Sequence, residues 1–401
     1  MKKKRTITSE YVSYGHPDKV ADQISDALLD EYLAVDSCSR VGIETMIKDN
    51  IVVVGGEIKC DYNINVDHII RNVLYNVNYP TSHKLDYNDI KIINLIGQQS
   101  HEISQGVDKN DDDNTIGAGD QGFVVGYASN ETKAYLPLGV YLARQICNGI
   151  TKIDGLGPDA KTQVSVEYGG RKAVVKSIVV STMHSEELSV EEVRKLIREM
   201  IETNRVGNDN VMDDETHLEY VKDKPIKYYL NENGVWNIGG SISDCGMTGR
   251  KIVVDNYGGY CNVGGGCFSG KDMSKIDRSG AYMARYLAKN IVDAGIAAEA
   301  KVTLSYVISK PEPYAIDVEL NGEMNSKIVD LSNQVKLFIE KNIDLTPNGI
   351  ICRFFGKGGT RPIFYNTARN GHFGFNDNNQ DYPWEKIDIS SDIADYMQIE
   401  I

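Results

Sequence analysis

The sequence predicts an α/β (α+β) protein made of three similar strand–helix units, and two observations carry this prediction. Its 401 residues are too many for one simple core, so about two to three domains are expected. A β-branched apolar run followed by apolar residues at helical spacing also occurs three times, and the runs begin about 125 residues apart. That distance matches domains of ordinary size.

The elements of these units can be read from the apolar pattern. The predicted strands are 51–58, 177–182 and 302–308, and the helices that follow them are 66–77, 190–201 and 328–339. Alternating and continuous β-branched runs favour strands, whereas spacings of three and four favour helices. Two further amphipathic helices are predicted at 17–33 and 278–294, the second ending near Gly295. Strand–helix units are common, so the pattern indicates triplication without proving it.

Two changes in composition predict the boundaries between units. Residues 98–119 are polar and rich in glycine and aspartate, which is typical of a loop, and the acidic run 111–113 is expected to be a solvated turn. Composition shifts again near Gly239. We therefore expect units at 1–102, 115–238 and 239–401, with a mobile loop at 99–114.

Charge and cysteine usage exclude several classes of protein. The chain carries 43 basic and 57 acidic residues, a net charge of −14, which argues against nucleic-acid binding. No apolar run approaches the length of a membrane span, and no apolar stretch follows the basic first residues. The seven cysteines are scattered without a CxxC pair, which suits a reduced compartment. We expect a cytoplasmic protein that binds neither nucleic acid nor membrane.

The segment 264–279, GGGCFSGKDMSKIDRS, is the most informative loop. Its glycines let backbone N–H groups approach an anion closely. Its cations are Lys271, Lys275 and Arg278, and its carboxylates are Asp272 and Asp277. Cations neutralise a polyphosphate, and carboxylates can hold the metal that accompanies it. The sequence therefore predicts a nucleotide polyphosphate site, with a flexible, solvated turn as the alternative.

A P-loop interpretation of the same segment is weaker. Residues 265–271 fit GxxxxGK, but the next position requires a Ser or Thr hydroxyl for magnesium. Asp272 stands there instead, and the preceding residues are not an obvious buried strand. An ordinary P-loop NTPase is therefore disfavoured.

A second constellation, GHPDK at 15–19, lies at the start of the first predicted helix. Pro17 suits the first helical position, and a helix N-terminus attracts anions. His16 and Lys19 would then lie where a phosphate binds, and Asp18 could hold a divalent metal. The alternative is a helix cap with a satisfied surface histidine.

Three further turns combine glycine or proline with charge. Residues 116–122 hold Asp120 before a predicted strand, and 158–161 lead into another. Residues 243–251 place Arg250 and Lys251 before the apolar run 252–254, which we interpret as the start of a strand. Each signal is weak alone, but loops mounted on regular elements are where sites are usually built.

Taken together, these motifs resemble the S-adenosylmethionine synthetase (methionine adenosyltransferase) family from about Thr8 to Lys386. The motifs are GHPDK, VVVGGEI, GAGDQG, DCGMTGRK, GGGCFSGKD, and GHFG followed by PWEK. The resemblance implies three similar α/β units with pseudo-threefold symmetry. It also implies homodimers whose active sites lie between subunits, paired into homotetramers.

The implied reaction has two parts. The methionine sulfur attacks C5′ of ATP and expels triphosphate, which is then hydrolysed to phosphate and diphosphate. A thioether needs no base, so the barrier lies in the leaving group, which cations and metal stabilise. Alignment of sulfur with C5′ supplies the rest. The implied cofactors are two Mg²⁺ and one K⁺ per site.

The resemblance also assigns roles to individual residues. The catalytic residues are His16, Lys161, Arg250, Lys251, Lys271 and Asp120. The ATP-binding residues are His16, Asp159, Lys161, Val235, Trp236, Arg250, Lys251, Cys267 and Lys271. The methionine-binding residues are Glu57, Gln99, Asp244 and Lys275. The metal ligands are Asp18 and Asp277 for Mg²⁺ and Glu44 for K⁺. The segment 99–109 matches a loop that gates the site and excludes water.

Departures from the family pattern leave these ligands intact. Trp236 stands where many members have Phe, and an indole stacks on adenine at least as well. Other departures are Tyr11, Tyr14, Cys267 and Met273. Two alternatives stay open: a noncatalytic nucleotide-binding subunit of the same fold, which would lack a charged ligand, and a triphosphatase without alkyl transfer.

Overall fold

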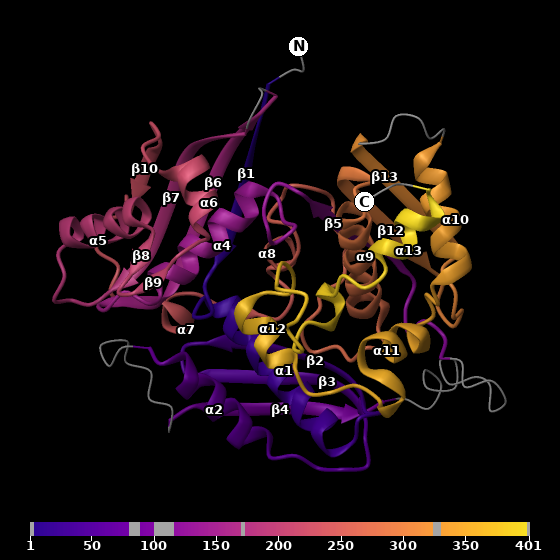
Figure 1. Cartoon of the computed structure of the whole chain (residues 1–401). Helices are drawn as coiled ribbons and strands as arrows, with labels where there is room; N and C mark the ends of the chain where they lie inside the picture. The colour runs from indigo at the N-terminus through magenta and orange to yellow at the C-terminus, as the bar shows by residue number, and fades with distance from the viewer. Residues whose placement is uncertain (1–3, 80–88, 100–115, 170–172, 324–329, 399–401) are drawn as a thin grey trace.

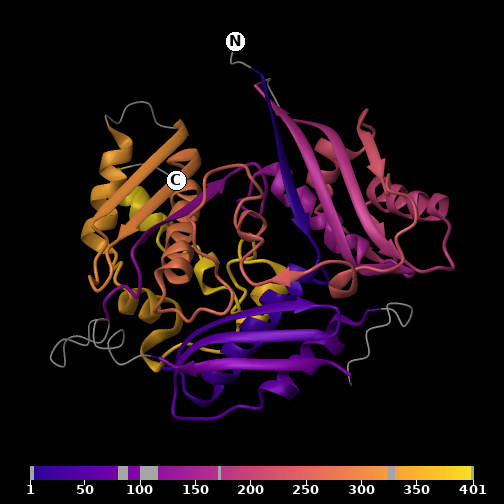
Figure 2. The same cartoon turned by 180° about the vertical axis from the view of Figure 1, so that it is seen from behind.

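Three α/β units surround the centre of the molecule in the computed structural model (Figures 1 and 2). The structure describes residues 4–79, 89–99, 116–169, 173–323 and 330–398. Each unit has one main sheet at the periphery, and the helices α1, α4 and α9 lie on the inner sides of the three sheets.

The first unit has the sheet order β11-β2-β3-β4. Its strands are β2 (Arg40–Lys48), β3 (Ile51–Lys59), β4 (Lys91–Gln98) and β11 (Gly246–Met247). Its helices are α1 (Pro17–Val35) and α2 (Val66–Val77). The tight β2–β3 hairpin is antiparallel, and β4 returns parallel to β3 after the helix α2.

The second unit has the sheet order β1-β6-β7-β10. Its strands are β1 (Arg5–Val12), β6 (Leu156–Tyr168), β7 (Val174–His184) and β10 (Lys227–Leu230). Its long helices are α4 (Leu138–Ile150) and α5 (Val190–Thr203). Short elements follow, namely β8 (Arg205–Val206), β9 (Asp209–Asn210), α6 (Asp214–Thr216) and the π-helical turn η2 (His217–Val221).

The third unit has the sheet order β13-β12-β5. Its strands are β5 (Gly122–Ser129), β12 (Ala297–Tyr306) and β13 (Ala315–Glu323). Its longer helices are α9 (Ile276–Asp293), α10 (Leu331–Asn342) and α11 (Pro347–Phe355). Shorter helical segments are η3 (Gly356–Gly358), α12 (Phe364–Asn370), η4 (Pro383–Glu385) and α13 (Ser390–Tyr396).

The three units repeat one plan, in which a helix, an antiparallel hairpin and a second helix follow one another. The hairpins are β2–β3, β6–β7 and β12–β13. The strand before each repeat pairs with the hairpin of another unit: β1 with β6, β5 with β12, and β11 with β2. Every sheet therefore takes one strand from a different third of the chain. The boundaries predicted at 102, 115 and 238 stay a prediction, since the sheets exchange strands across them.

The observed elements differ from the sequence pattern in two places. The predicted strand 302–308 lies on β12, the first strand of its hairpin, so β13 stands between it and α10. The predicted strands 51–58 and 177–182 lie instead on β3 and β7, the second strands of their hairpins. The apolar run 252–254, interpreted as a strand, forms the short helix α8 (Ile252–Asp255). Its last residue, Asp255, is held by a buried ion pair with Lys19 at 2.6 Å, so tertiary contacts override the β-branched preference.

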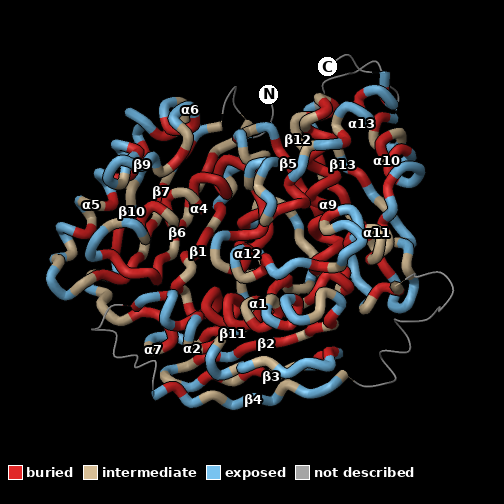
Figure 3. Tube along the Cα trace, turned by 60° about the horizontal axis from the view of Figure 1, so that its bottom comes forward, coloured by how far each residue is buried: buried red, intermediate tan, exposed pale blue. Residues whose placement is uncertain are grey.

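Burial concentrates on the elements that face the centre of the molecule (Figure 3). Most of α1 and α9 is buried, including many of their polar residues. In contrast, the outer face of the β11-β2-β3-β4 sheet is open and partly apolar: Leu95 is 65% exposed, and Ile93, Met46 and Met247 are also exposed. An apolar sheet face without a cover is a candidate interaction surface.

Among the described residues, no helix combines the length and the apolar character that a bilayer span needs.

Candidate active site

The N-terminus of α1 carries the first predicted site residue, His16. The His16 ring caps the helix, because its Nδ1 accepts a hydrogen bond from the Asp18 backbone N–H at 3.2 Å, and Pro17 takes the first helical position. Burial, together with the nearby Lys251 ammonium, lowers the pKa of His16 to about 4. The imidazole is therefore neutral at pH 7.

Asp18 lies at the centre of a charged group. Its side chain is 1% exposed, and its Oδ2 lies 2.5 Å from the Lys251 ammonium. The Arg250 guanidinium is 3.6 Å from Oδ1, which also accepts the Met247 N–H at 3.0 Å. Asp18 lies far in sequence from the neighbouring residues Arg250 and Lys251, and the structure brings the three side chains together.

Strand β6 adds Asp159 and Lys161 to this group. Asp159 is buried and accepts the Gly240 N–H at 2.7 Å, and burial raises its pKa to about 7. The Lys161 ammonium pairs with Glu10 on the neighbouring strand β1 at 3.0 Å. We call His16, Asp18, Asp159, Lys161, Arg250 and Lys251 the nucleotide cluster.

Two predicted adenine contacts lie on the segment that follows β10. Val235 is largely exposed, whereas Trp236 is half-buried. The Trp236 backbone N–H donates to His184 at 3.2 Å, and its indole N–H donates to the Ile238 carbonyl at 2.9 Å. The ring orientation is thus fixed by local hydrogen bonds.

A second charged group lies on the glycine-rich loop. The Lys271 ammonium pairs with Asp277 at 2.6 Å. Gly266 permits this arrangement, because a Cβ at that position would lie 2.0 Å from the Asp277 carboxyl carbon. Cys267 lies close by, and burial raises the pKa of its thiol to about 11. We call Glu44, Cys267, Lys271 and Asp277 the loop cluster; Glu44 reaches it from β2, which forms an isolated bridge to Lys271 through Gly42.

Asp272, the residue that breaks the P-loop pattern, is held by hydrogen bonds and ion pairs within the protein. It accepts the Val41 N–H at 2.7 Å and the Ser274 N–H at 2.8 Å. Burial opposes its ionisation, but the charges of Lys275 and Arg40 and these hydrogen bonds lower its pKa to about 2. Lys275, predicted to bind methionine, pairs with Asp272 at 2.5 Å. The carboxylate therefore anchors the loop to β2.

Four aspartates at intervals of four residues line one face of α1. We call Asp18, Asp22, Asp26 and Asp30 the aspartate ladder. Each carboxylate accepts a backbone N–H from a loop of the C-terminal third, and the donors are Met247, Gly249, Gly270 and Phe364, at 2.8–3.0 Å. The ladder thus holds the segments that carry both clusters against a single helix.

The comparisons with known proteins agree with this arrangement. Three family models match in order along the chain: the S-adenosylmethionine synthetase N-terminal domain at residues 4–101, the central domain at 115–235 and the C-terminal domain at 238–386. The chain belongs to the S-adenosylmethionine synthetase family. The resemblance proposed from the motifs is confirmed.

Relatives in the S-adenosylmethionine synthetase family match over nearly their whole length. The S-adenosylmethionine synthase of Borreliella afzelii is 40% identical over 98% of this chain and 98% of its own. That of Clostridium botulinum is 40% identical over 98% of this chain and 100% of its own. The solved structure of an unusual S-adenosylmethionine synthetase from Campylobacter jejuni, 33% identical, matches with a TM-score of 0.84 over 98% of this chain and 99% of its own. The predicted three-unit α/β fold is therefore confirmed.

Several residues predicted for S-adenosylmethionine synthetase chemistry lie apart from the nucleotide cluster. Glu44 and Glu57 are exposed on the outer face of the β2–β3 hairpin. Asp120 is exposed on a turn, and Gln99 follows β4. Asp244 is also exposed on a turn, but it lies near the nucleotide cluster, because its charge acts on the pKa of both His16 and Asp159. Of the gating loop predicted at 99–114, only Gln99 lies within the described residues.

Within the described part of the chain, no hydrogen bond or ion pair joins the nucleotide cluster to the loop cluster. The described part of the chain also contains no group of three or more His, Cys, Asp or Glu side chains that could hold a metal ion. Among the described residues, the two clusters are held by separate sets of contacts.

Sequence reasoning placed Lys19 at the phosphate-binding end of α1, but the structure buries it. Its ammonium lies 3.0 Å from Asp22 and 2.6 Å from Asp255, so it stabilises the core instead of facing a ligand. Sequence reasoning also missed Glu10, the partner of Lys161, and most of the aspartate ladder. The ladder had a signal, because aspartates at i, i+4 and i+8 share one helix face.

Proposed function

We propose that this chain is a methionine adenosyltransferase that converts ATP, L-methionine and water to S-adenosylmethionine, phosphate and diphosphate. The observation that carries the proposal is the buried Asp18 carboxylate between Arg250 and Lys251. Two cations and a carboxylate at a helix N-terminus suit a metal-bound polyphosphate better than a neutral ligand. Membership of the S-adenosylmethionine synthetase family supports the same reaction.

The ion pairs of both clusters explain how the protein tolerates so much buried charge. Lys251 is neutralised by Asp18 and Lys271 by Asp277. A triphosphate supplies new partners for both ammonium groups and for Arg250. Asp18 and Asp277 would then be free to hold Mg²⁺. Glu44, exposed on β2, would hold K⁺. Mg²⁺ is usually bound by one or two carboxylates plus substrate phosphates, which fits carboxylates that are separate in one chain.

The protein side chains stabilise the leaving triphosphate. The bound Mg²⁺ would supply additional compensation for its growing negative charge. His16 is neutral at pH 7, so its ring can donate a hydrogen bond near the leaving oxygen without carrying a proton into the reaction. Lys161, Arg250, Lys251 and Lys271 supply fixed positive charge as the C5′–oxygen bond breaks.

The substrates are positioned by the remaining predicted residues. Asp159, Val235, Trp236 and Cys267 would contact the nucleoside and phosphates of ATP. Glu57, Gln99, Asp244 and Lys275 would contact methionine, whose ammonium and carboxylate call for charged partners of both signs. Lys275 must exchange Asp272 for the methionine carboxylate to do so. Asp120, exposed beside the glycine-rich turn, completes the catalytic set.

The complete site requires a second copy of the chain. We propose a homodimer, paired further into a homotetramer, in which the nucleotide cluster of one copy meets the loop cluster of the other. The open apolar face of the β11-β2-β3-β4 sheet supports this, because Glu44 and Glu57 lie on the same face as Met46 and Leu95. Covering that face would bring the two glutamates to a subunit boundary.

The redox state of the cysteines supports work in the cytoplasm. All seven cysteines, including exposed Cys38 and Cys352, are free thiols. Exposed free thiols are typical of proteins kept in a reducing compartment.

The test is incubation of the purified protein with ATP, Mg²⁺ and K⁺, with and without L-methionine, followed by mass spectrometry and phosphate assays. We expect S-adenosylmethionine only with methionine, and phosphate and diphosphate in equal amounts to it. Phosphate release without the sulfonium product would indicate a triphosphatase. No turnover would indicate a noncatalytic nucleotide-binding subunit.

A further inference from the structure

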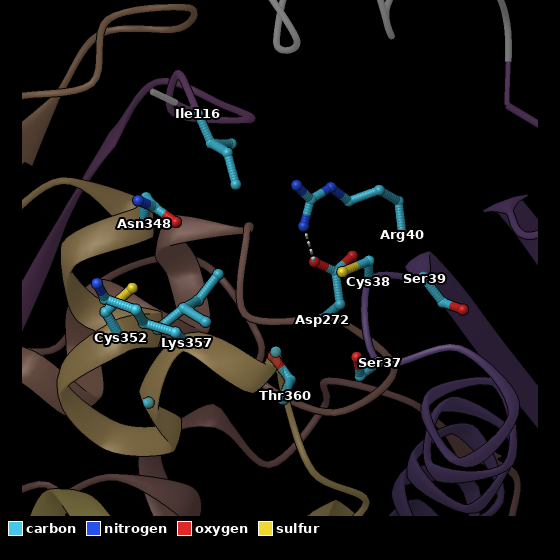
Figure 4. Close-up of a pocket in the computed structure, with 13 residues that line it drawn as sticks. Ser37, Cys38, Ser39, Arg40, Ile116, Asp272, Asn348, Cys352, Lys357 and Thr360 are labelled. Carbon is cyan, nitrogen blue, oxygen red and sulfur yellow. Dashed lines mark ion pairs between the residues drawn. The ribbon is translucent and has the colours of Figure 1, made fainter. Parts of the chain in front are cut away.

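A separate cavity of about 330 Å³ lies where the loop from α1 to β2 meets α11 and the turn that follows it (Figure 4). Its volume falls within the range of small-molecule sites, about 300–1,000 Å³. It shares Asp272 with the anchor of the glycine-rich loop but contains no residue of the nucleotide cluster or the loop cluster. The family reaction leaves this cavity without a role.

The charge of the lining is positive in a chain that is strongly acidic. Of the 13 lining residues drawn in Figure 4, two are cations, Arg40 and Lys357, and one is a carboxylate, Asp272. Lys275, outside the cavity, already pairs with Asp272 at 2.5 Å. The Asp272 carboxylate is therefore shared between Arg40 and Lys275, and the lining of the cavity keeps an excess of positive charge.

Arg40 is the main observation that points to a ligand. Its side chain is only 18% exposed, yet its ion pair with Asp272 is loose at 3.7 Å. Within the described residues its guanidinium makes no hydrogen bond, and Lys357 forms no ion pair. A guanidinium carries five N–H donors in a planar fork that matches a carboxylate or phosphate. Burying it without such partners is costly.

Hydrogen bonds between Ser37 and the turn 358–360 hold another wall of the cavity in place. The Ser37 hydroxyl donates to the Gly358 carbonyl at 3.0 Å, and the Thr360 N–H donates to the Ser37 carbonyl at 3.1 Å. Gly359 has a φ of +84°, and a Cβ there would lie 2.5 Å from the Ser37 hydroxyl oxygen. The turn therefore needs glycine to approach the α1–β2 loop, and this approach closes one side of the cavity.

We propose that this cavity binds a small organic or inorganic anion, with a carboxylate or phosphate head held by Arg40 and Lys357. The side chains of Ile116 and Ile351 also line the cavity and offer an apolar surface for the rest of the molecule. In Figure 4, Arg40 reaches in from one wall, and Lys357 and Cys352 lie on the opposite wall. The site goes beyond the proposed transferase activity and does not depend on it.

Two exposed thiols give a direct test, because Cys38 and Cys352 both line the cavity. The full-length protein is treated with iodoacetamide, and the alkylation rate of each thiol is followed by peptide mass spectrometry. The probes are inorganic phosphate and butyrate, added in separate titrations at constant ionic strength. A probe at twice its Kd should slow alkylation of both thiols about threefold. Protection by phosphate identifies a phosphate head, and protection by butyrate identifies a carboxylate on an apolar body.

Variants decide whether protection comes from this cavity. Lys357 lies on an exposed turn, so Lys357→Gln removes its charge with little effect on folding. Arg40→Gln removes the guanidinium. Each variant should abolish the protection of both thiols. Lys336→Gln, which removes a cation of α10 outside the cavity, is the matched control and should keep it. Unchanged alkylation with both probes would overturn the proposal. Protection that persists in Lys357→Gln and Arg40→Gln would overturn it as well.

Discussion

The two charged clusters are built from the same residue types but differ in how firmly one chain holds them. In the nucleotide cluster, Asp18 is almost fully buried and has three partners on the segment 247–251. In the loop cluster, Lys271 and Asp277 form one ion pair with each other among the described residues, and their side chains are 23% and 17% exposed. Glu44 and Glu57 are more exposed still.

This difference in the number of contacts indicates which part of the proposed site is preorganised. Preorganised charge costs no rearrangement when a transition state forms, so a buried, cross-linked cluster suits the triphosphate end of ATP. A cluster held by a single ion pair suits groups that complete a site with a second chain. The aspartate ladder serves both, because Asp22 holds the loop before Arg250 and Asp26 holds the loop before Lys271.

The largest expected effect comes from removing the support shared by the two clusters. Asp26→Ala leaves the fully buried Arg278 guanidinium without its bidentate partner. We expect the free energy of unfolding to fall by about 3–5 kcal/mol, the usual result of breaking a buried pair on one side. Urea denaturation measures this. Asp67→Ala removes the acid of an exposed pair on α2 and should cost less than about 1 kcal/mol. Equal losses in both variants would contradict a supporting role for the ladder.

The second prediction tests the weaker-held cluster directly. Lys271→Ala should lower turnover by about two to three orders of magnitude, because one stabiliser of the leaving triphosphate is lost. Steady-state kinetics at saturating ATP and methionine measures it. The control is Lys301→Ala, which removes a partly buried cation of β12 that pairs with Glu319. Turnover near the wild-type value in Lys271→Ala would remove the triphosphate role.

Mixing two inactive variants sharpens this result. If each site takes one cluster from each chain, Lys251→Ala and Lys271→Ala co-expressed in equal amounts form mixed dimers with one intact site. Half of the dimers are mixed, so about a quarter of wild-type activity should return. No recovery in a sample that contains mixed dimers would place both clusters of a site in one chain.

A third prediction separates the substrates on the exposed sheet face. Glu57→Gln should raise the KM for methionine roughly tenfold or more, since a charged hydrogen bond is lost, with little change in the KM for ATP. Glu44→Gln changes the same sheet face and should alter the dependence on K⁺ instead. If Glu57→Gln raised the KM for ATP more than the KM for methionine, Glu57 would not be part of the methionine site.

The smallest expected effect concerns pH and the buried carboxylate of the firmer cluster. Burial raises the pKa of Asp159 to about 7, so the group takes up a proton as pH falls through 7 and accepts hydrogen bonds less well. We expect kcat/KM for ATP to fall about fivefold to tenfold between pH 8 and pH 6. Asp159→Asn should flatten the profile. His16→Asn should leave the inflection of the pH profile near pH 7 unchanged, because the pKa of His16 is about 4. An inflection that survives in Asp159→Asn but disappears in His16→Asn would reverse the assignment.

Local patterns in the sequence predicted elements better than partners. The helices at 66–77 and 190–201 form α2 (Val66–Val77) and α5 (Val190–Thr203) close to the predicted ends, because helical spacing is a local signal. The pairing of β1 with β6 could not be predicted, since strands show which face is buried but not which strand lies beside them. The strand expected at 252–254 failed because Asp255 is tied to Lys19.

The candidate site shows the same limit. Motifs brought Asp18, Arg250 and Lys251 into one prediction, and the structure places both cations within 4 Å of the Asp18 carboxylate. The motifs could not show that Lys19 and Lys275 have acidic partners of their own. A cation in a turn looks the same in sequence whether it faces a ligand or a neighbouring carboxylate.

The exchange of strands among the three sheets has a consequence for synthesis on the ribosome. Strand β1 leaves the exit tunnel early, but Arg5 pairs with Tyr168. Likewise Ile47 of β2 pairs with Gly246, and Phe123 of β5 pairs with Ser305. The sheet of the first third cannot be completed until β11 of the last third has been translated, and β1 and β5 have open edges until their later partners emerge. Open strand edges are prone to aggregation. Folding of this protein is therefore tied to the finished chain, and shortened translation products are expected to be substrates for chaperones and proteases.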